Sequence, residues 1–193
     1  MKKMYCLSLA AIFLISNYAF SQIQKGNILL GGDIANFDLG LQKGAVFQMQ
    51  IEPKLAFFIH NNFAVGTYIS IDLQSVSGND KVTYGAGLLS RYFIPDKNNM
   101  TLMRHSRFFL EATAGIAGSH ITGTGNTDGL GIGFGPGYSY FLSPNISLES
   151  LLKYDGLIGF GTATYQSDLN LNIGFQIYLD SRRLRKTLTN DTN

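Results

Sequence analysis

The chain has 193 residues, 45% of them hydrophobic, and its 15 basic residues nearly balance its 13 acidic ones. This length suits one domain, and the near-neutral charge argues against nucleic acid as a partner, because nucleic-acid-binding domains carry a clear excess of Lys and Arg. The only cysteine is Cys6, so no disulfide can form within the chain.

Residues 1–21 have the organisation of a cleaved secretory signal peptide. Lys2 and Lys3 precede an apolar run at 7–15, and Ala19 and Ser21 supply small residues at the cleavage site. The apolar run is shorter than the roughly 20 residues that a membrane helix needs. Cleavage after Ser21 would remove two of the 15 basic residues and leave 13, equal to the 13 acidic ones. We therefore expect an exported, neutral mature protein.

The mature sequence alternates apolar and polar residues over long stretches, and residues 63–74 show this best. Strand side chains point alternately to opposite faces, so such a stretch has one apolar and one polar face. The apolar face carries Phe63, Val65, Thr67, Ile69, Ile71 and Leu73, and the polar face carries Ala64, Gly66, Tyr68, Ser70, Asp72 and Gln74.

Eight stretches follow this pattern, and most are about as long as a tilted strand that crosses a bilayer. They are residues 26–36, 47–58, 63–74, 82–93, 107–117, 129–141, 146–154 and 167–179. If these strands form a barrel, carboxylates, amides and glycines lie inside and the apolar face lies outside, which excludes a soluble ligand-binding barrel. We therefore predict an all-β fold for residues 22–179, an eight-stranded antiparallel up-and-down transmembrane β-barrel.

An internal repeat supports this register. The pattern that begins at Pro53 recurs 83 residues later at Pro136, and each copy spans a strand, a tight turn and the start of the next strand. Each proline removes a donor from the strand ladder, so we expect a bulge or a weakened ladder at both. Four glycines in the sixth strand are expected to make room for bulky neighbours inside the barrel: Gly131, Gly133, Gly135 and Gly137.

Four segments resemble the small outer-membrane β-barrel domain family, which is similar in build to OmpX and to the barrel of OmpA. They are residues 52–54, 63–66, 109–112 and 135–145. The resemblance implies a location in the outer membrane, contact with its lipid and lipopolysaccharide, and insertion by the barrel-assembly machinery. It also implies a structural or surface-interaction role, in adhesion or envelope integrity, without enzymatic activity.

The chain departs from this family at its C-terminal end. Residues 180–193 follow the last predicted strand and contain Arg182, Arg183, Arg185 and Lys186. We expect a basic, disordered tail on the periplasmic side.

The polar faces of the strands place nine charged side chains inside the predicted barrel. They are Asp33, Glu52, Lys54, Asp72, Arg91, Glu111, Glu149, Lys153 and Asp168. Buried charges must be paired, and eight strands enclose a bore just wide enough for side chains to fill. We predict a lower layer of Arg91 with Glu111 and an upper layer of Lys153 with Asp168. Because three bases cannot neutralise six acids, some upper carboxylates should be solvated or protonated.

Two alternatives to a structural role remain open at this stage. His120 and Thr122 resemble the His-x-Ser pair of outer-membrane lipid A deacylases, with Asp72 or Asp168 as the orienting acid, although Thr is a poor replacement for Ser. The charged lumen would also suit a narrow channel. The glycine-rich loop at 123–129 lacks the acidic spacing of a calcium loop and opens no helix, so we expect no metal and no cofactor. An extracellular partner could bind the loops, but the sequence does not identify one.

Overall fold

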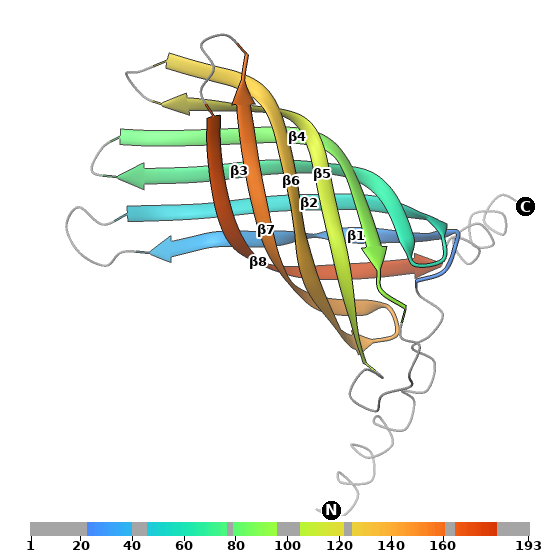
Figure 1. Cartoon of the computed structure of the whole chain (residues 1–193). Helices are drawn as coiled ribbons and strands as arrows, with labels where there is room; N and C mark the ends of the chain where they lie inside the picture. Colours follow the sequence, from blue (N-terminus) through green and yellow to red (C-terminus); the bar gives the residue numbers. More distant parts are fainter. Residues whose placement is uncertain are drawn as a thin grey trace, which may run out of the picture.

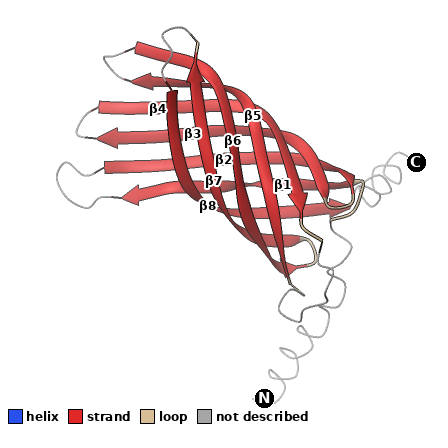
Figure 2. Ribbon diagram, viewed as in Figure 1, coloured by secondary structure: helices blue, strands red, loops and turns tan. Residues whose placement is uncertain are grey.

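A computed structural model describes residues 23–39, 46–76, 79–95, 105–121, 125–160 and 165–180, and these residues form a closed antiparallel barrel. Each strand pairs with the next along the chain, and β1 closes the barrel against β8 (Figures 1 and 2). The predicted fold and all eight predicted strands are therefore confirmed. The strands are β1 (Asn27–Leu39), β2 (Val46–His60), β3 (Phe63–Val76), β4 (Asn79–Phe93), β5 (Ser106–Ile121), β6 (Gly125–Ser143), β7 (Ile146–Gly159) and β8 (Tyr165–Asp180).

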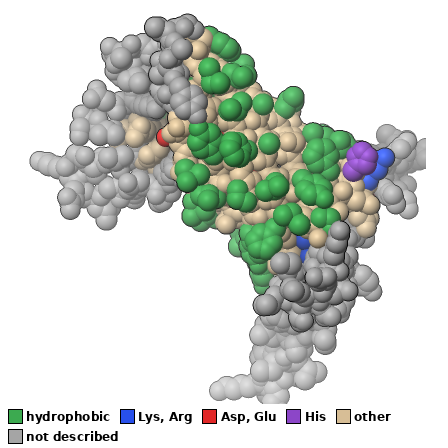
Figure 3. Space-filling model, in the orientation of Figure 1, with side chains coloured by type: hydrophobic (Ala, Val, Ile, Leu, Met, Phe, Trp, Pro, Cys, Tyr) green, Lys and Arg blue, Asp and Glu red, His purple; other side chains and the backbone are tan. Residues whose placement is uncertain are grey.

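The outer wall of the barrel is apolar, and hydrophobic side chains cover it from strand to strand (Figure 3). Large side chains such as Leu88, Ile116 and Leu169 are more than 60% exposed on this wall. Most of the polar partners in the alternation are buried or half-buried on the inner side, so the predicted faces are confirmed. No helix among the described residues is long and apolar enough to cross a membrane.

The barrel has two different ends, which we call the turn end and the loop end. At the turn end, tight turns join β2 to β3 and β6 to β7, and Asn62 has a positive φ of 65°. The carbonyl of Asn62 accepts a hydrogen bond from the amide of Phe93, and that of Asn145 accepts one from Tyr178. The loop end is the end at which the chain passes from β1 to β2, from β3 to β4, from β5 to β6 and from β7 to β8.

The internal repeat is visible in the backbone. A bulge between Phe58 and His60 in the β2–β3 register recurs between Phe141 and Ser143 in the β6–β7 register. At Pro53 the pairing of β2 with β3 is interrupted without a change of register, and pairing of β6 with β7 is interrupted in the same way at Pro136. The expectation of a bulge or a weakened ladder is therefore confirmed in its second form, a weakened ladder without a bulge. A missing donor leaves a gap in the ladder but does not require an extra residue.

Among the described residues, the closing seam between β1 and β8 is paired over its turn-end half. The register runs from Asn27 with Asp180 to Ile34 with Ile173 and stops there. Immediately beyond, a bulge between Ala35 and Asp38 shifts the register of β1 on β2. A bulge bends the strand that carries it. In Figure 1, β1 and β8 run side by side over the paired half and separate toward the loop end.

Candidate functional site: the charged lumen

Aromatic side chains close the turn-end part of the lumen. Their ring centroids lie 5.4 to 6.4 Å apart, within the range of favourable aromatic pairs. This aromatic plug consists of Phe58, Phe93, Phe109, Phe141 and Tyr178. Gly137 makes room for it, because a Cβ at that position would lie 2.2 Å from the Phe109 ring. The expected role of the glycines is confirmed at this position.

Arg91 lies on top of the plug and binds two carboxylates. Its Nη2 atom is 2.5 Å from Glu111 Oε2, and its Nη1 atom is 2.6 Å from Glu149 Oε2. The guanidinium also lies over the Phe109 ring, 4.2 Å from the centroid, in a cation–π arrangement. The Arg91 side chain is only 1% exposed, so each of these contacts forms away from water.

Three hydroxyl groups complete the coordination of Glu149. Its Oε1 atom accepts hydrogen bonds from Ser139 Oγ at 2.5 Å, Ser147 Oγ at 3.1 Å and Tyr178 Oη at 2.9 Å. These donors satisfy the oxygen that Arg91 does not reach. A buried carboxylate with four donors is stable at this position without a second base.

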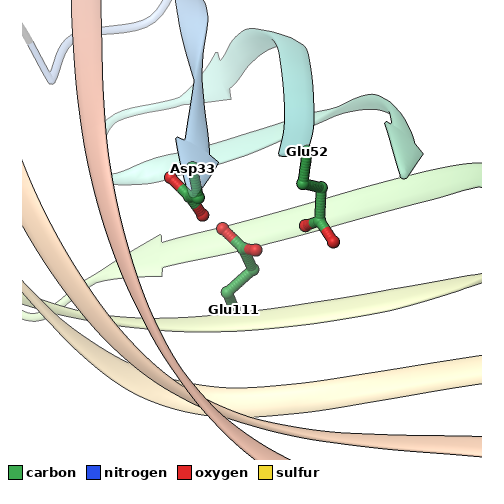
Figure 4. Close-up of side chains that lie close together, drawn as sticks. All are labelled: Asp33, Glu52 and Glu111. Carbon is green, nitrogen blue, oxygen red and sulfur yellow. The ribbon is translucent and has the colours of Figure 1, made fainter. Parts of the chain in front are cut away.

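Lys54 lies at the centre of three acids. Asp33, Glu52 and Glu111 come from β1, β2 and β5, and their carboxylates point toward one another (Figure 4). One oxygen from each lies within 4.8 Å of the others, which is the spacing of a metal site. The Lys54 ammonium already contacts all three, pairing with Asp33, with Glu111 at 2.5 Å and with Glu52 at 3.2 Å. The lysine therefore holds the position that a cation would take.

Lys153 connects this cluster to the loop-end part of the lumen. Its Nζ atom lies 2.9 Å from both Glu52 oxygens and 3.3 Å from Asp155 Oδ1. The predicted pair with Asp168 is wrong, because Lys153 lies opposite Asn170 in the β7–β8 register and Asp168 lies opposite Asp155. Lys153 therefore extends into the lumen toward Glu52 on β2.

A cavity of about 120 Å³ lies above Lys153 toward the loop end. Asp72, Asp155 and Asp168 line it together with Tyr68 and Asn170. Asp168 is exposed, and within the described part of the chain it has no ion-pair partner. The lumen thus has a sealed half and an acidic open half. The sealed half contains Asp33, Glu52, Lys54, Arg91, Glu111, Glu149 and Lys153, and the open half contains Asp72, Asp155 and Asp168.

Two contributors to the lumen were missed at the level of sequence. Asp155 lies one residue beyond the predicted strand at 146–154, but β7 continues to Gly159, and its inward alternation runs from Glu149 through Lys153 to Asp155. Tyr178 is not among the charged side chains expected inside the barrel, yet its hydroxyl donates a hydrogen bond to Glu149 Oε1. Continuing the alternation by two residues would have found the first.

The alternative site at His120 and Thr122 is only partly described. The backbone of His120 belongs to β5 and pairs with Val82 and Asn126, but its side chain and all of Thr122 lie outside the described residues. Segments 1–22 and 181–193, with the predicted signal peptide and most of the basic tail, also lie outside them. These assignments stay predictions.

Comparison with known proteins supports the architecture. No protein-family model and no curated protein sequence matches the chain. Among solved structures, Neisserial surface protein A matches with a TM-score of 0.57 and 16% identity, over 79% of this chain and 97% of that protein. The N-terminal β-barrel domain of Pseudomonas aeruginosa OprF matches with a TM-score of 0.52 and 12% identity, over 80% of this chain and 98% of the domain. The chain therefore has the fold of the small eight-stranded outer-membrane barrels.

Proposed function

We propose that this protein is an integral outer-membrane barrel that acts through its surface, in adhesion or envelope integrity, and does not conduct solutes as a porin does. The observation that carries this proposal is the combination of an apolar outer wall with a lumen sealed by ion pairs. An apolar wall is stable only in lipid, and a barrel without open edges satisfies its backbone groups there.

Two layers seal the lumen in series. The aromatic plug closes the turn end, and the network around Lys54 and Arg91 fills the bore above it. Opening a path would separate Arg91 from Glu111 and Glu149, which leaves buried charges without partners. The loops and the exposed outer wall are therefore the surfaces through which the protein meets lipopolysaccharide and any extracellular partner.

Membrane fractionation and planar-bilayer recording test this proposal together. We expect the mature protein in the outer-membrane fraction, with different gel mobility before and after heating, because a folded barrel stays compact until it is heated. In bilayers we expect no sizeable steady conductance. Recovery as a soluble periplasmic protein would contradict the location, and porin-like conductance would show that the lumen is open.

The surface role has its own test. Cysteines introduced into the loops, on a mature chain that we expect to contain none, would carry photocrosslinkers on intact cells. Crosslinks to lipopolysaccharide or to a surface component support the proposal, and a deletion strain with weakened adhesion or envelope integrity supports it independently. The proposal would be contradicted if the deletion strain kept normal adhesion and envelope integrity and the loops formed no crosslinks.

A further inference from the structure

The sealed half of the lumen has one more acid than it has bases. Among the described residues it contains four acids and three bases, and each of these seven side chains is at most 3% exposed. The acids are Asp33, Glu52, Glu111 and Glu149, and the bases are Lys54, Arg91 and Lys153. An uncompensated charge is strongly unfavourable where water is excluded, so the sealed half requires one further positive charge.

Asp33 is the least compensated of the four acids. Glu52 and Glu111 each contact two bases, and Glu149 contacts one base and three hydroxyl groups. Asp33 contacts one base, Lys54, and the other two acids drawn in Figure 4 share this lysine. The missing positive charge is therefore needed most at Asp33.

Gln176 lies beside Asp33 and has an unsatisfied oxygen. Its Nε2 atom donates a hydrogen bond to Asp33 Oδ1 at 3.0 Å, whereas its Oε1 atom is without a hydrogen-bond partner although the side chain is fully buried. This Oε1 atom and the carbonyl oxygen of Phe175 both lie 2.2 Å from the place that a Cβ would take on Gly31. One acceptor therefore lies next to another. Buried amide oxygens are normally satisfied, so Gln176 indicates a further donor at this place.

A proton on Asp33 would supply both the positive charge and the donor. A half-turn of the Gln176 carboxamide exchanges the positions of Oε1 and Nε2. The protonated carboxyl group of Asp33 then donates its O–H to Oε1, and Nε2 turns toward the Phe175 carbonyl. The second Asp33 oxygen continues to accept a hydrogen bond from Lys54. One proton thus satisfies the amide and cancels the excess negative charge.

A metal ion would fit this place less well than a proton. Asp33, Glu52 and Glu111 have the spacing of a metal site, but the Lys54 ammonium contacts all three carboxylates. Asp33 Oδ1 also fills the space above Gly174, since a Cβ on that glycine would lie 2.0 Å from it. A metal ion would have to displace the lysine, whereas a proton needs no additional space.

We propose that the sealed half of the lumen binds one proton, held by Asp33 and shared with Gln176. The carboxylate takes this proton from water when the barrel folds, because a free aspartate is ionised at neutral pH. The site goes beyond the proposed surface role and does not depend on it. The charged groups around Asp33 come from four strands: Glu52 and Lys54 of β2, Arg91 of β4, Glu111 of β5, and Glu149 and Lys153 of β7.

Infrared spectroscopy of the folded mature protein, isotopically labelled in its aspartate carboxyl groups, tests for this proton. A protonated carboxyl group absorbs at a clearly higher frequency than a carboxylate. We expect such a band at neutral pH, and we expect Asp33→Asn to remove it. Asp180→Asn, the same change at the turn end of β8, should leave it in place. Absence of the band from the parent protein, or its persistence in Asp33→Asn, would overturn the proposal.

A second pair of variants tests the role of Gln176. Gln176→Met removes the acceptor and keeps a side chain of similar length, so the Asp33 band should shift to the frequency of a carboxyl group without a hydrogen bond. Gln50 lines the cavity at the loop end, and Gln50→Met should leave the band unchanged. An unchanged band in Gln176→Met would show that the proton is not shared with Gln176.

The pH dependence of unfolding tests for the proton without a spectroscopic label. If the folded protein binds one proton more than the unfolded chain, the equilibrium constant for unfolding rises about tenfold for each unit of pH. We expect the parent protein to exceed Asp33→Asn by this slope between about pH 6 and 8, where the histidines titrate in both proteins and cancel. Equal slopes would overturn the proposal.

The stability of two matched variants at neutral pH gives an independent test. Asparagine resembles a protonated aspartate, so Asp33→Asn should raise the unfolding constant less than about tenfold. Glu111→Gln neutralises an acid that two bases bind, and it should raise this constant about a hundredfold or more. Equal losses in the two variants would show that Asp33 is ionised in the folded barrel.

Discussion

The two halves of the lumen differ in how their charged side chains are accommodated. In the turn-end half, four buried acids meet three bases and several hydroxyl donors, and the aromatic plug lies beneath them. In the loop-end half, Asp72, Asp155 and Asp168 surround a cavity, and Lys153 reaches Asp155 from below. The turn-end half of the lumen is therefore tightly packed and paired, whereas the loop-end half is open to solvent. The same kind of substitution should have different effects at the two ends.

The largest expected effect is at Arg91. Arg91→Ala leaves Glu111 and Glu149 buried without their shared base, and we expect a loss of about 3–5 kcal/mol in the free energy of unfolding. Thermal unfolding in detergent, followed by gel mobility, measures it. Arg107→Ala is the control, since Arg107 is only half-buried and binds the Ser106 carbonyl. An Arg91→Ala protein with an unchanged unfolding temperature would show that the sealed half is hydrated.

The next effect contrasts the outer wall with the cavity at adjacent residues. Ile71→Arg places a charge in lipid near the bilayer midplane, at a cost of about 2–4 kcal/mol, and Ile173→Arg should behave similarly. Ser70→Arg points into the acidic cavity and should be tolerated better. Yields of folded protein after refolding into bilayers measure the difference. Equal effects at residues 70 and 71 would mean that the faces of β3 are assigned incorrectly.

Substitution of two glycines on β6 tests how tightly each half of the lumen is packed. Gly137→Ala brings a Cβ to 2.2 Å from Phe109 in the plug, so we expect a loss of about 1–3 kcal/mol from overpacking. At Gly131, beside the cavity, the nearest atom would be Ala117 Cβ at 3.2 Å, and Gly131→Ala should cost less than about 1 kcal/mol. Denaturant unfolding of both variants measures this. The reverse order would place the tight packing at the loop end.

The smallest effect is expected at Asp168. Asp168→Asn removes an exposed charge, so stability should change by about 0.5 kcal/mol or less, and relief of repulsion from Asp155 favours a small gain. Glu149→Gln is the matched change in the sealed half and should be clearly destabilising, because Glu149 is the partner of Arg91. Comparable losses in the two variants would show that the open half is as tightly coupled as the sealed one.

The fold could be predicted from the sequence because alternation reports directly on which environment each face meets. In residues 63–74, the apolar and polar sets identified from the sequence are the exposed and inward sets of β3. The strand ends at the loop end were harder to predict from the sequence. There β4, β6 and β7 continue past the apolar band, where outward residues no longer need to be apolar.

The lumen was harder to predict than the wall. The pairing of Arg91 with Glu111 follows from their direct opposition in the β4–β5 register. The partner of Lys153 does not follow from its own hairpin, because its flexible side chain crosses the bore to Glu52 on β2. The β1–β8 pairing ends at Ile34, next to the bulge after Ala35, and no glycine or proline at residues 35–38 marks this bulge in the sequence.

The unequal length of the strand registers also leads us to expect a particular order of strand pairing during folding. Among the described residues, the β1–β8 register covers Asn27–Ile34, whereas the β5–β6 register covers Ser106–Ile121. The β1–β8 seam also joins opposite ends of the sequence, so its formation carries the largest loop-closure entropy of any strand pair. We therefore expect closure of this seam to be the final kinetic step of folding, and we expect thermal unfolding of the barrel to begin there.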